Sequence, residues 1–209
     1  MSFATQTKLE LCALPSTDVE VLRSELYAML LLARHFSQDR IEFKTENKNT
    51  ADHFVSLCSM LFSPIIERTE PLTNKSKTYT VKIIDSSDCK RIFEFFGHDD
   101  RDINLRVNRA NIPDANCERA FVRGAFLACG NINDPEKEYR AEFNVKNKEL
   151  AEELKDLLLL YGINMKASVR QSGVQLYVKD SASVEDLLTL IGAGRKTLDI
   201  IDTKIMKEV

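Results

Sequence analysis

The stretch ERAFVRGAFLACGNI, residues 118–132, combines helical periodicity with an unusual run of small side chains. Bulky Phe121 and Phe126 stand between the small residues Gly124, Ala128 and Cys129. Gly124 and Ala128 are four residues apart and therefore share one face of a helix. Small side chains let a second helix backbone approach closely, so the pattern predicts a closely packed helix over 117–132. The alternative is an ordinary amphipathic core helix.

The elements expected around this helix follow one order in each half: helix, strand, helix, strand, strand, helix. In the first half we expect helices over 18–36, 50–62 and 86–96, and strands over 40–46, 65–70 and 77–84, with the polar turn LTNKSK between the last two strands. In the second half we expect helices over 117–132, 149–161 and 183–191, and strands over 139–146, 164–171 and 174–179, with a hairpin turn at Ser172-Gly173.

The recurring order predicts an α+β fold of two half-domains related by pseudo-twofold symmetry, with helices packed on antiparallel sheets. Aligning Phe36 with Ile132 places Ala28 opposite Gly124, so the two first helices should meet at a seam of Ala28, Gly124 and Ala128. The expected segments are an amino-terminal arm over 1–16, a first half over 17–98, a linker over 99–116, a second half over 117–192 and a terminal helix or linker over 193–209.

The composition is typical of a globular chain: 209 residues, 44% hydrophobic and 29% charged, with a net charge of -3. This balance argues against DNA binding through bulk positive charge but leaves local basic patches open. The five cysteines form no CxxC pair, which is typical of reduced thiols. No signal peptide is visible, and the apolar runs are shorter than the ~20 residues of a membrane span. We therefore expect a cytoplasmic, nucleoid-associated protein without membrane contact.

The central motif FVRGAFLACGNI resembles the LAGLIDADG motif of homing endonucleases, with Gly124 and Gly130 at its two glycines. The resemblance implies two αββαββα halves joined by the paired motif helices, although the order expected here departs from that topology at the ends. In that family the acidic residue before the final glycine of each motif binds the catalytic metal. The matching positions hold Ala33 and Cys129, which cannot supply carboxylate oxygens to a hard cation.

Three stretches, MSFATQTKLEL, CERAFVRGAFLACGNINDPEKEYRAEF and LIGAGRKTLDIIDTKI, are similar to the WhiA family of bacterial sporulation and cell-division regulators, a likeness that covers nearly the whole chain. The resemblance implies a degenerate LAGLIDADG domain without nuclease chemistry, in a transcriptional regulator of cell division, chromosome segregation and sporulation. It also implies a helix-turn-helix that binds promoter DNA beyond Val209, outside this chain. Either a fragment or a naturally short protein fits this departure.

The strand faces expected to point away from the helices are rich in cations. In the second half these are Arg140, Lys146, Lys166, Arg170 and Lys179, against the single acid Glu142. In the first half they are Arg40, Lys44 and Lys82, mixed with Glu42, Glu46 and Glu67. A basic sheet face predicts weak, non-specific contact with DNA phosphates. The alternative is a solvated face whose charges block edge pairing.

The remaining motifs indicate no metal, cofactor or small-molecule site. GAGRKT over 192–197 lacks the spacing and the preceding strand of a phosphate-binding loop. A helix-turn-helix over 183–206 would present few basic residues, and HDDRD over 98–102 lacks the offsets of a calcium loop. Two rivals to a DNA-contacting domain stay open: a scaffold that binds a protein partner in transcription or division, and an active endonuclease.

Overall fold

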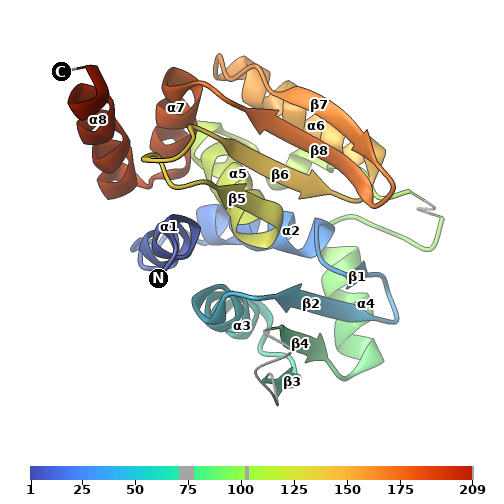
Figure 1. Ribbon diagram of the computed structural model, residues 1–209. Helices are drawn as coiled ribbons and strands as arrows, with labels where there is room; N and C mark the ends of the chain where they lie inside the picture. The colour runs from blue at the N-terminus through green and yellow to red at the C-terminus, as the bar shows by residue number, and fades with distance from the viewer. Residues whose placement is uncertain (71–77, 102–103, 209) are drawn as a thin grey trace.

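The computed structural model describes residues 1–70, 78–101 and 104–208. The turn LTNKSK, residues 72–77, lies outside them. The fold is a mixture of helices and two antiparallel four-stranded sheets, which confirms the α+β prediction (Figure 1).

Each half has the order αββαββα. The first half comprises α2 (Val19–Leu31), β1 (His35–Phe36), β2 (Ile41–Thr45), α3 (Lys48–Phe62), β3 (Ile66–Thr69), β4 (Tyr79–Ile83) and α4 (Ser86–Phe95). The second half comprises α5 (Ala115–Cys129), β5 (Gly130–Ile132), β6 (Ala141–Val145), α6 (Lys148–Leu160), β7 (Lys166–Arg170), β8 (Gly173–Val178) and α7 (Ser181–Ile191). The helices α1 (Phe3–Cys12) and α8 (Gly194–Glu208) flank the two halves, and the short 3-10 helix η1 (Arg109–Asn111) precedes α5.

The predicted ends of the two motif helices were wrong. Helices were expected to run to Phe36 and Ile132, but both residues lie in short strands, β1 and β5, which pair with β2 and β6. In these strands the backbone hydrogen bonds go to a neighbouring strand instead of the helix. The two strands complete the αββαββα order, so the expected departure from the LAGLIDADG topology was also wrong.

The expected hairpin turn was displaced by one residue. Arg170 pairs with Gly173, so the turn is Gln171-Ser172 and Gly173 already belongs to β8. Gly173 has a φ of 136°, and a Cβ atom there would lie 2.3 Å from the carbonyl oxygen of Val145. Glycine at this position therefore serves a left-handed backbone and a close strand approach, rather than the turn itself.

The sheets have the strand orders β1-β2-β4-β3 and β5-β6-β8-β7. Helices α3 and α4 cover one face of the first sheet, and α5 and α6 cover one face of the second (Figure 1). Strand alternation sends Ile41, Phe43 and Val81 into the first core, and Phe143 and Leu176 into the second. The opposite face of each sheet stays free of helices, so both sheets present a polar surface.

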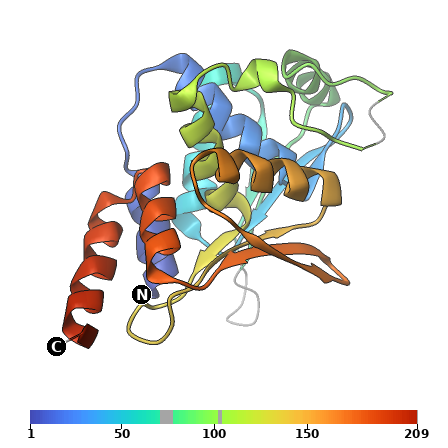
Figure 2. The ribbon, with the colours of Figure 1, turned by 90° about the horizontal axis from the view of Figure 1, so that it is seen from above.

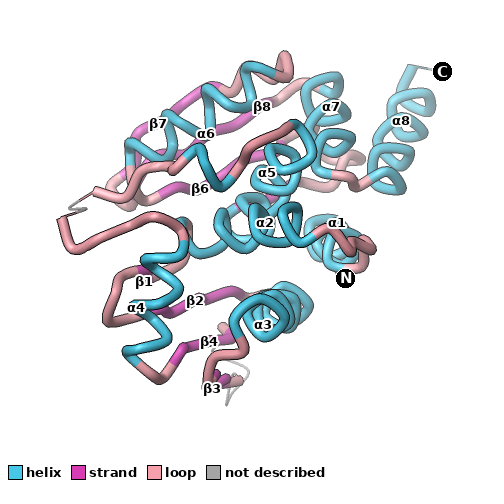
Figure 3. Tube along the Cα trace, turned by 180° about the vertical axis from the view of Figure 1, so that it is seen from behind, coloured by secondary structure: helices cyan, strands magenta, loops and turns pink. Residues whose placement is uncertain are grey.

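Helices α2 and α5 pack side by side between the two sheets (Figure 3). A Cβ atom at Gly124 would lie 2.2 Å from the Glu25 carbonyl oxygen and 3.1 Å from the Ala28 Cβ atom. Next to this contact the Glu25 carboxylate, 3% exposed, accepts hydrogen bonds from His53 at 2.7 Å and from the Nε atom of Arg123 at 2.8 Å. This buried cluster joins α2, α3 and α5 across the centre of the molecule.

The terminal helices α1 and α8 are tied together on one side of the molecule (Figures 1 and 2). The Glu10 carboxylate accepts hydrogen bonds from the backbone N–H groups of Arg195 and Lys196, at 2.8 and 3.2 Å. The Lys196 ammonium donates to the Gln6 side chain at 2.8 Å. Glu10 thus caps the first turn of α8 from another helix. Within the described residues, no helix is long and apolar enough to cross a membrane.

Candidate nucleic-acid interface

The strand register places the predicted cations of the second half on the helix-free face of its sheet. Lys166 pairs with Tyr177, which pairs with Glu142, and residues opposite one another in register share a face. Alternation along β6 and β7 adds Arg140 and Arg170 to this face.

These cations are not equally available to a ligand. Arg140 is held 2.7 Å from Glu142, and its guanidinium lies 4.9 Å from the Tyr177 ring centre. Lys179 lies 4.0 Å from Glu138 and is exposed. Lys166 and Arg170 are exposed, and Arg170 donates to the Gln175 side chain at 2.8 Å. Arg140 therefore serves to order the face, while Lys166 and Arg170 reach solvent.

The first sheet carries a buried carboxylate beneath three cations. Glu42 lies on the helix-free face of β2, yet its side chain is only 3% exposed. Its carboxylate contacts Arg40 at 2.6 Å, Lys44 at 3.1 Å and Arg34 at 3.7 Å. Burial alone would raise the pKa of Glu42, but hydrogen bonds from Arg40 and Lys44 outweigh it and hold the pKa at about 2. Lys82 pairs in register with Glu42 and is half-buried.

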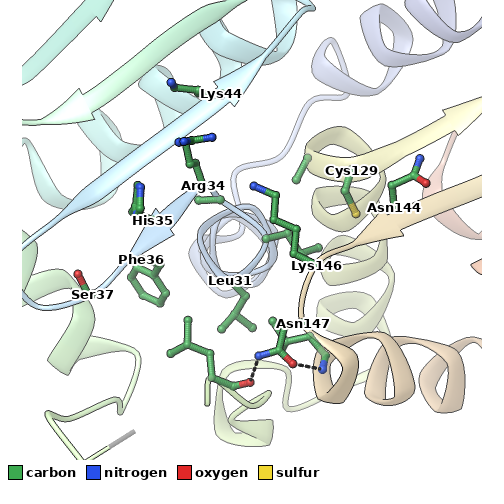
Figure 4. Close-up of a pocket in the computed structure, with 15 residues that line it drawn as sticks. Leu31, Arg34, His35, Phe36, Ser37, Lys44, Cys129, Asn144, Lys146 and Asn147 are labelled. Carbon is green, nitrogen blue, oxygen red and sulfur yellow. Dashed lines mark hydrogen bonds between the residues drawn. The ribbon is translucent and has the colours of Figure 1, made fainter. Parts of the chain in front are cut away.

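A cavity of about 560 Å³ opens between the two halves at the carboxyl-terminal ends of α2 and α5 (Figure 4). Both positions that match the metal-binding acids of homing endonucleases, Ala33 and Cys129, line it. Arg34, Lys44 and Lys146 line it as well. Partial burial and the nearby charge of Arg40 lower the pKa of His35, which also lies on its wall.

The metal of those nucleases does not fit this donor set. The cavity lining contains no carboxylate, and the described residues contain no group of three or more His, Cys, Asp or Glu residues placed to hold a metal. Burial raises the pKa of the Cys129 thiol to about 12, with Lys8 acting in the opposite direction. Cys129 is therefore a neutral thiol near pH 7 and a poor ligand for a hard cation.

Sequence reasoning missed three residues of this region. Arg34 and His35 were assigned to a helix, whereas the chain leaves α2 at Leu31 and delivers both to the cavity. The available signal was Arg34 at the position matching Gly130, the final glycine of the motif. Lys8 belongs to α1, and its ammonium donates to the carbonyl oxygen of Leu127 at 3.1 Å. No local pattern connects Lys8 with a helix more than a hundred residues away.

The terminal segment has neither the geometry of a phosphate loop nor free cations for base contacts. In GAGRKT the Glu10 carboxylate occupies the backbone N–H groups of Arg195 and Lys196. The Lys196 ammonium contacts Asp199, and Lys204 lies 3.6 Å from Glu185. Ile200 is 1% exposed, so α8 packs on the body of the protein. These contacts support a terminal packing helix.

The chain matches known proteins over its whole length. Residues 118–209 match the family of the WhiA LAGLIDADG-like domain. A protein of Ruminiclostridium cellulolyticum, called probable cell division protein WhiA, is 30% identical over 222 residues, covering 100% of this chain and 69% of its own. The chain belongs to the WhiA family. Another WhiA relative, from Clostridium botulinum strain Hall, is 29% identical over 226 residues, covering 100% of this chain and 70% of its own.

Solved structures agree with this placement at the level of the fold. Full-length DUF199/WhiA from Thermatoga maritima superposes with a TM-score of 0.78 at 20% identity, covering 100% of this chain and 68% of that one. The homing endonuclease I-DmoI, solved with DNA and Mn, superposes with a TM-score of 0.57 at 14% identity, covering 83% of this chain and 97% of that one. The WhiA-family chain therefore shares its αββαββα halves with a DNA-cleaving enzyme while lacking that enzyme family's acids at Ala33 and Cys129.

Proposed function

We propose that this chain is a non-catalytic, DNA-contacting domain of a regulator of cell division, chromosome segregation and sporulation that works in the cytoplasm, at the nucleoid. The observation that carries the proposal is the pairing of cationic sheet faces with a central cavity free of carboxylates. The helix-free face of the LAGLIDADG-like fold supports contact with duplex DNA. The names of the WhiA relatives support the link to cell division.

Binding should be weak and independent of sequence. Contacts to phosphates release counterions and position a protein on DNA, whereas contacts to base edges specify the sequence. With a net charge of -3 and few free cations, this chain should bind any duplex with a dissociation constant of ~10⁻⁴–10⁻⁶ M. The proposed contacts are Arg140, Lys146, Lys166, Arg170 and Lys179 in the second half, and Arg40, Lys44 and Lys82 in the first half.

A charge-reversal pair tests the proposal. The double variant Lys166→Glu/Arg170→Glu should weaken binding to any duplex and lower the slope of log K against log salt by roughly 0.9 for each phosphate that the variant no longer neutralises. Lys90→Glu/Lys148→Glu makes the same change in net charge on helices α4 and α6, behind the sheets, and should have little effect. Fluorescence anisotropy with two unrelated duplexes across a salt series measures both. Equal weakening in the two variants, or no binding at low salt by the unmodified chain, would refute DNA contact through this face.

One feature favours a second candidate, a surface for a protein partner in transcription or division. Helix α8 exposes the large apolar side chains of Leu198, Ile205 and Met206. Exposed apolar residues gathered on one element are typical of protein contacts. If DNA binding is absent, we propose the scaffold function for this chain.

A further inference from the structure

The central cavity concentrates positive charge from three separate segments of the chain. Arg34 follows α2, Lys44 belongs to β2 and Lys146 follows β6, and all three line the cavity. In Figure 4 these side chains lie around the end of α2, with Cys129 and Asn144 beyond them. No Asp or Glu lines the cavity, so its lining carries at least three positive charges.

The one acid beneath these cations does not reach the cavity. Glu42 is 3% exposed, while Arg34 and Arg40 are 50% and 55% exposed and Lys44 is 38% exposed. With a pKa of about 2, Glu42 stays ionised near pH 7 and neutralises one of the three charges while it orders all of them. The cluster therefore presents pre-positioned donors and a net positive charge to an anion.

Two features of the backbone oppose an anion and must be outweighed. The carboxyl-terminal ends of α2 and α5 carry partial negative charge toward the cavity. The Lys8 ammonium already takes the Leu127 carbonyl at the end of α5. Partial charges of about half an elementary charge per helix end are smaller than the full charges of Arg34, Lys44 and Lys146.

A second cavity at the pseudo-symmetric position provides an internal comparison. It measures about 390 Å³ and is lined by Glu46 and Asn131, which match Lys146 and His35 in the order of elements. Lys8 and Glu46 there carry opposite charges. Only the cavity with Lys146 has a lining of one sign, so an anion should prefer it.

We infer that the central cavity is a phosphate-binding site in which Arg34, Lys44 and Lys146 supply the positive charge that metal ions supply in the related nucleases. Planar guanidinium and ammonium donors hold a phosphate without activating a water molecule, so the site grips but does not cleave. If the proposed function is correct, the phosphate belongs to the backbone of duplex DNA, and the inference about its source rests on that function. A free phosphate is the other source of the same chemistry.

A matched pair of variants of the full chain separates the cavity from the rest of the cationic face. Arg34→Gln/Lys146→Gln and Lys166→Gln/Arg170→Gln each remove one arginine and one lysine. Two probes are used: inorganic phosphate, followed by amide NMR shifts, and a short duplex, followed by anisotropy. Lys146→Gln alone serves as the milder variant, since Lys146 has no ion pair within the described part of the chain. The amide spectrum of each variant establishes that it is folded.

Inorganic phosphate should shift the amides of residues 31–37 and 144–147 in the unmodified protein and leave those around Glu46 unmoved. The central pair of substitutions should abolish these shifts and lower duplex affinity roughly tenfold more than the edge pair, because it removes charge-assisted hydrogen bonds. Uniform shifts over all cationic surfaces, or no shifts, would overturn the phosphate site. Duplex binding that depends on the edge pair alone would leave the proposed function standing and refute the cavity as its phosphate site. Localised phosphate binding without duplex binding would support the cavity as a site for free phosphate and refute the proposed function.

Discussion

Replacing Gly124 by alanine tests the close approach of α2 and α5. The added Cβ atom would lie 2.2 Å from the carbonyl oxygen of Glu25, where ordinary contact begins near 3.4 Å. Because the nearest atom belongs to the backbone, no change of side-chain rotamer relieves the clash. The two helices must separate by about 1 Å along a seam that is otherwise packed to the density of a protein interior.

The expected cost follows from two opposing effects. Overpacking of a core contact costs about 1–3 kcal/mol, and the better helix propensity of alanine returns at most about 1 kcal/mol. The free energy of unfolding should fall by ~1–2 kcal/mol, which lowers the urea midpoint by about 0.5–1 M at a slope of ~2 kcal/mol/M.

Gly194→Ala is the matched control, because a Cβ atom at that first residue of α8 meets nothing within 4 Å. Its urea midpoint should stay unchanged or rise. Urea titrations followed by circular dichroism measure all three proteins. A Gly124→Ala midpoint equal to or above that of the unmodified protein would show that the helices can part freely and would refute the reasoning.

Three further outcomes are expected. Supercoiled plasmid incubated with the chain and magnesium or manganese should remain uncut, and cleavage that survives repurification would contradict a non-catalytic domain. Glu42→Gln should remove stability that is full above the ordinary carboxyl pKa of 4.5 and disappears as the pH falls toward about 2, since the folded-state pKa is depressed; thermal unfolding from pH 7 to 2 should show the two proteins converging at the acid end, and a constant gap would argue against the ion cluster. Glu10→Gln should cost about 0.5–2 kcal/mol by weakening the cap on α8; hydrogen exchange in α8 should accelerate more than in the exposed-face control Glu152→Gln, and equal exchange would remove the capping role.

Periodicity alone determined much of the architecture. Alternating apolar residues such as Ile41 and Phe43 place one strand face against helices, and the duplicated order of elements indicates two related halves. The small residues at Gly124 and Ala28 predicted a close helix pair, because side-chain size is a local property that any tight contact must respect. The absence of acids at Ala33 and Cys129 is likewise readable from the chain itself.

Tertiary structure alone decided where the two motif helices stop and what gathers beyond them. The short strands β1 and β5 exist because their backbone groups pair with strands several residues later in the chain, a non-local choice that helical periodicity cannot reveal. That choice delivers Arg34 to Glu42 and to the central cavity. Burial of Glu42 beneath cations on the polar face of β2, and the reach of Lys8 to the end of α5, depend on distances between segments that are far apart in sequence. Hydrophobic pattern therefore specified the elements and their buried faces, whereas the charge of the cavity arose only when the fold brought distant side chains together.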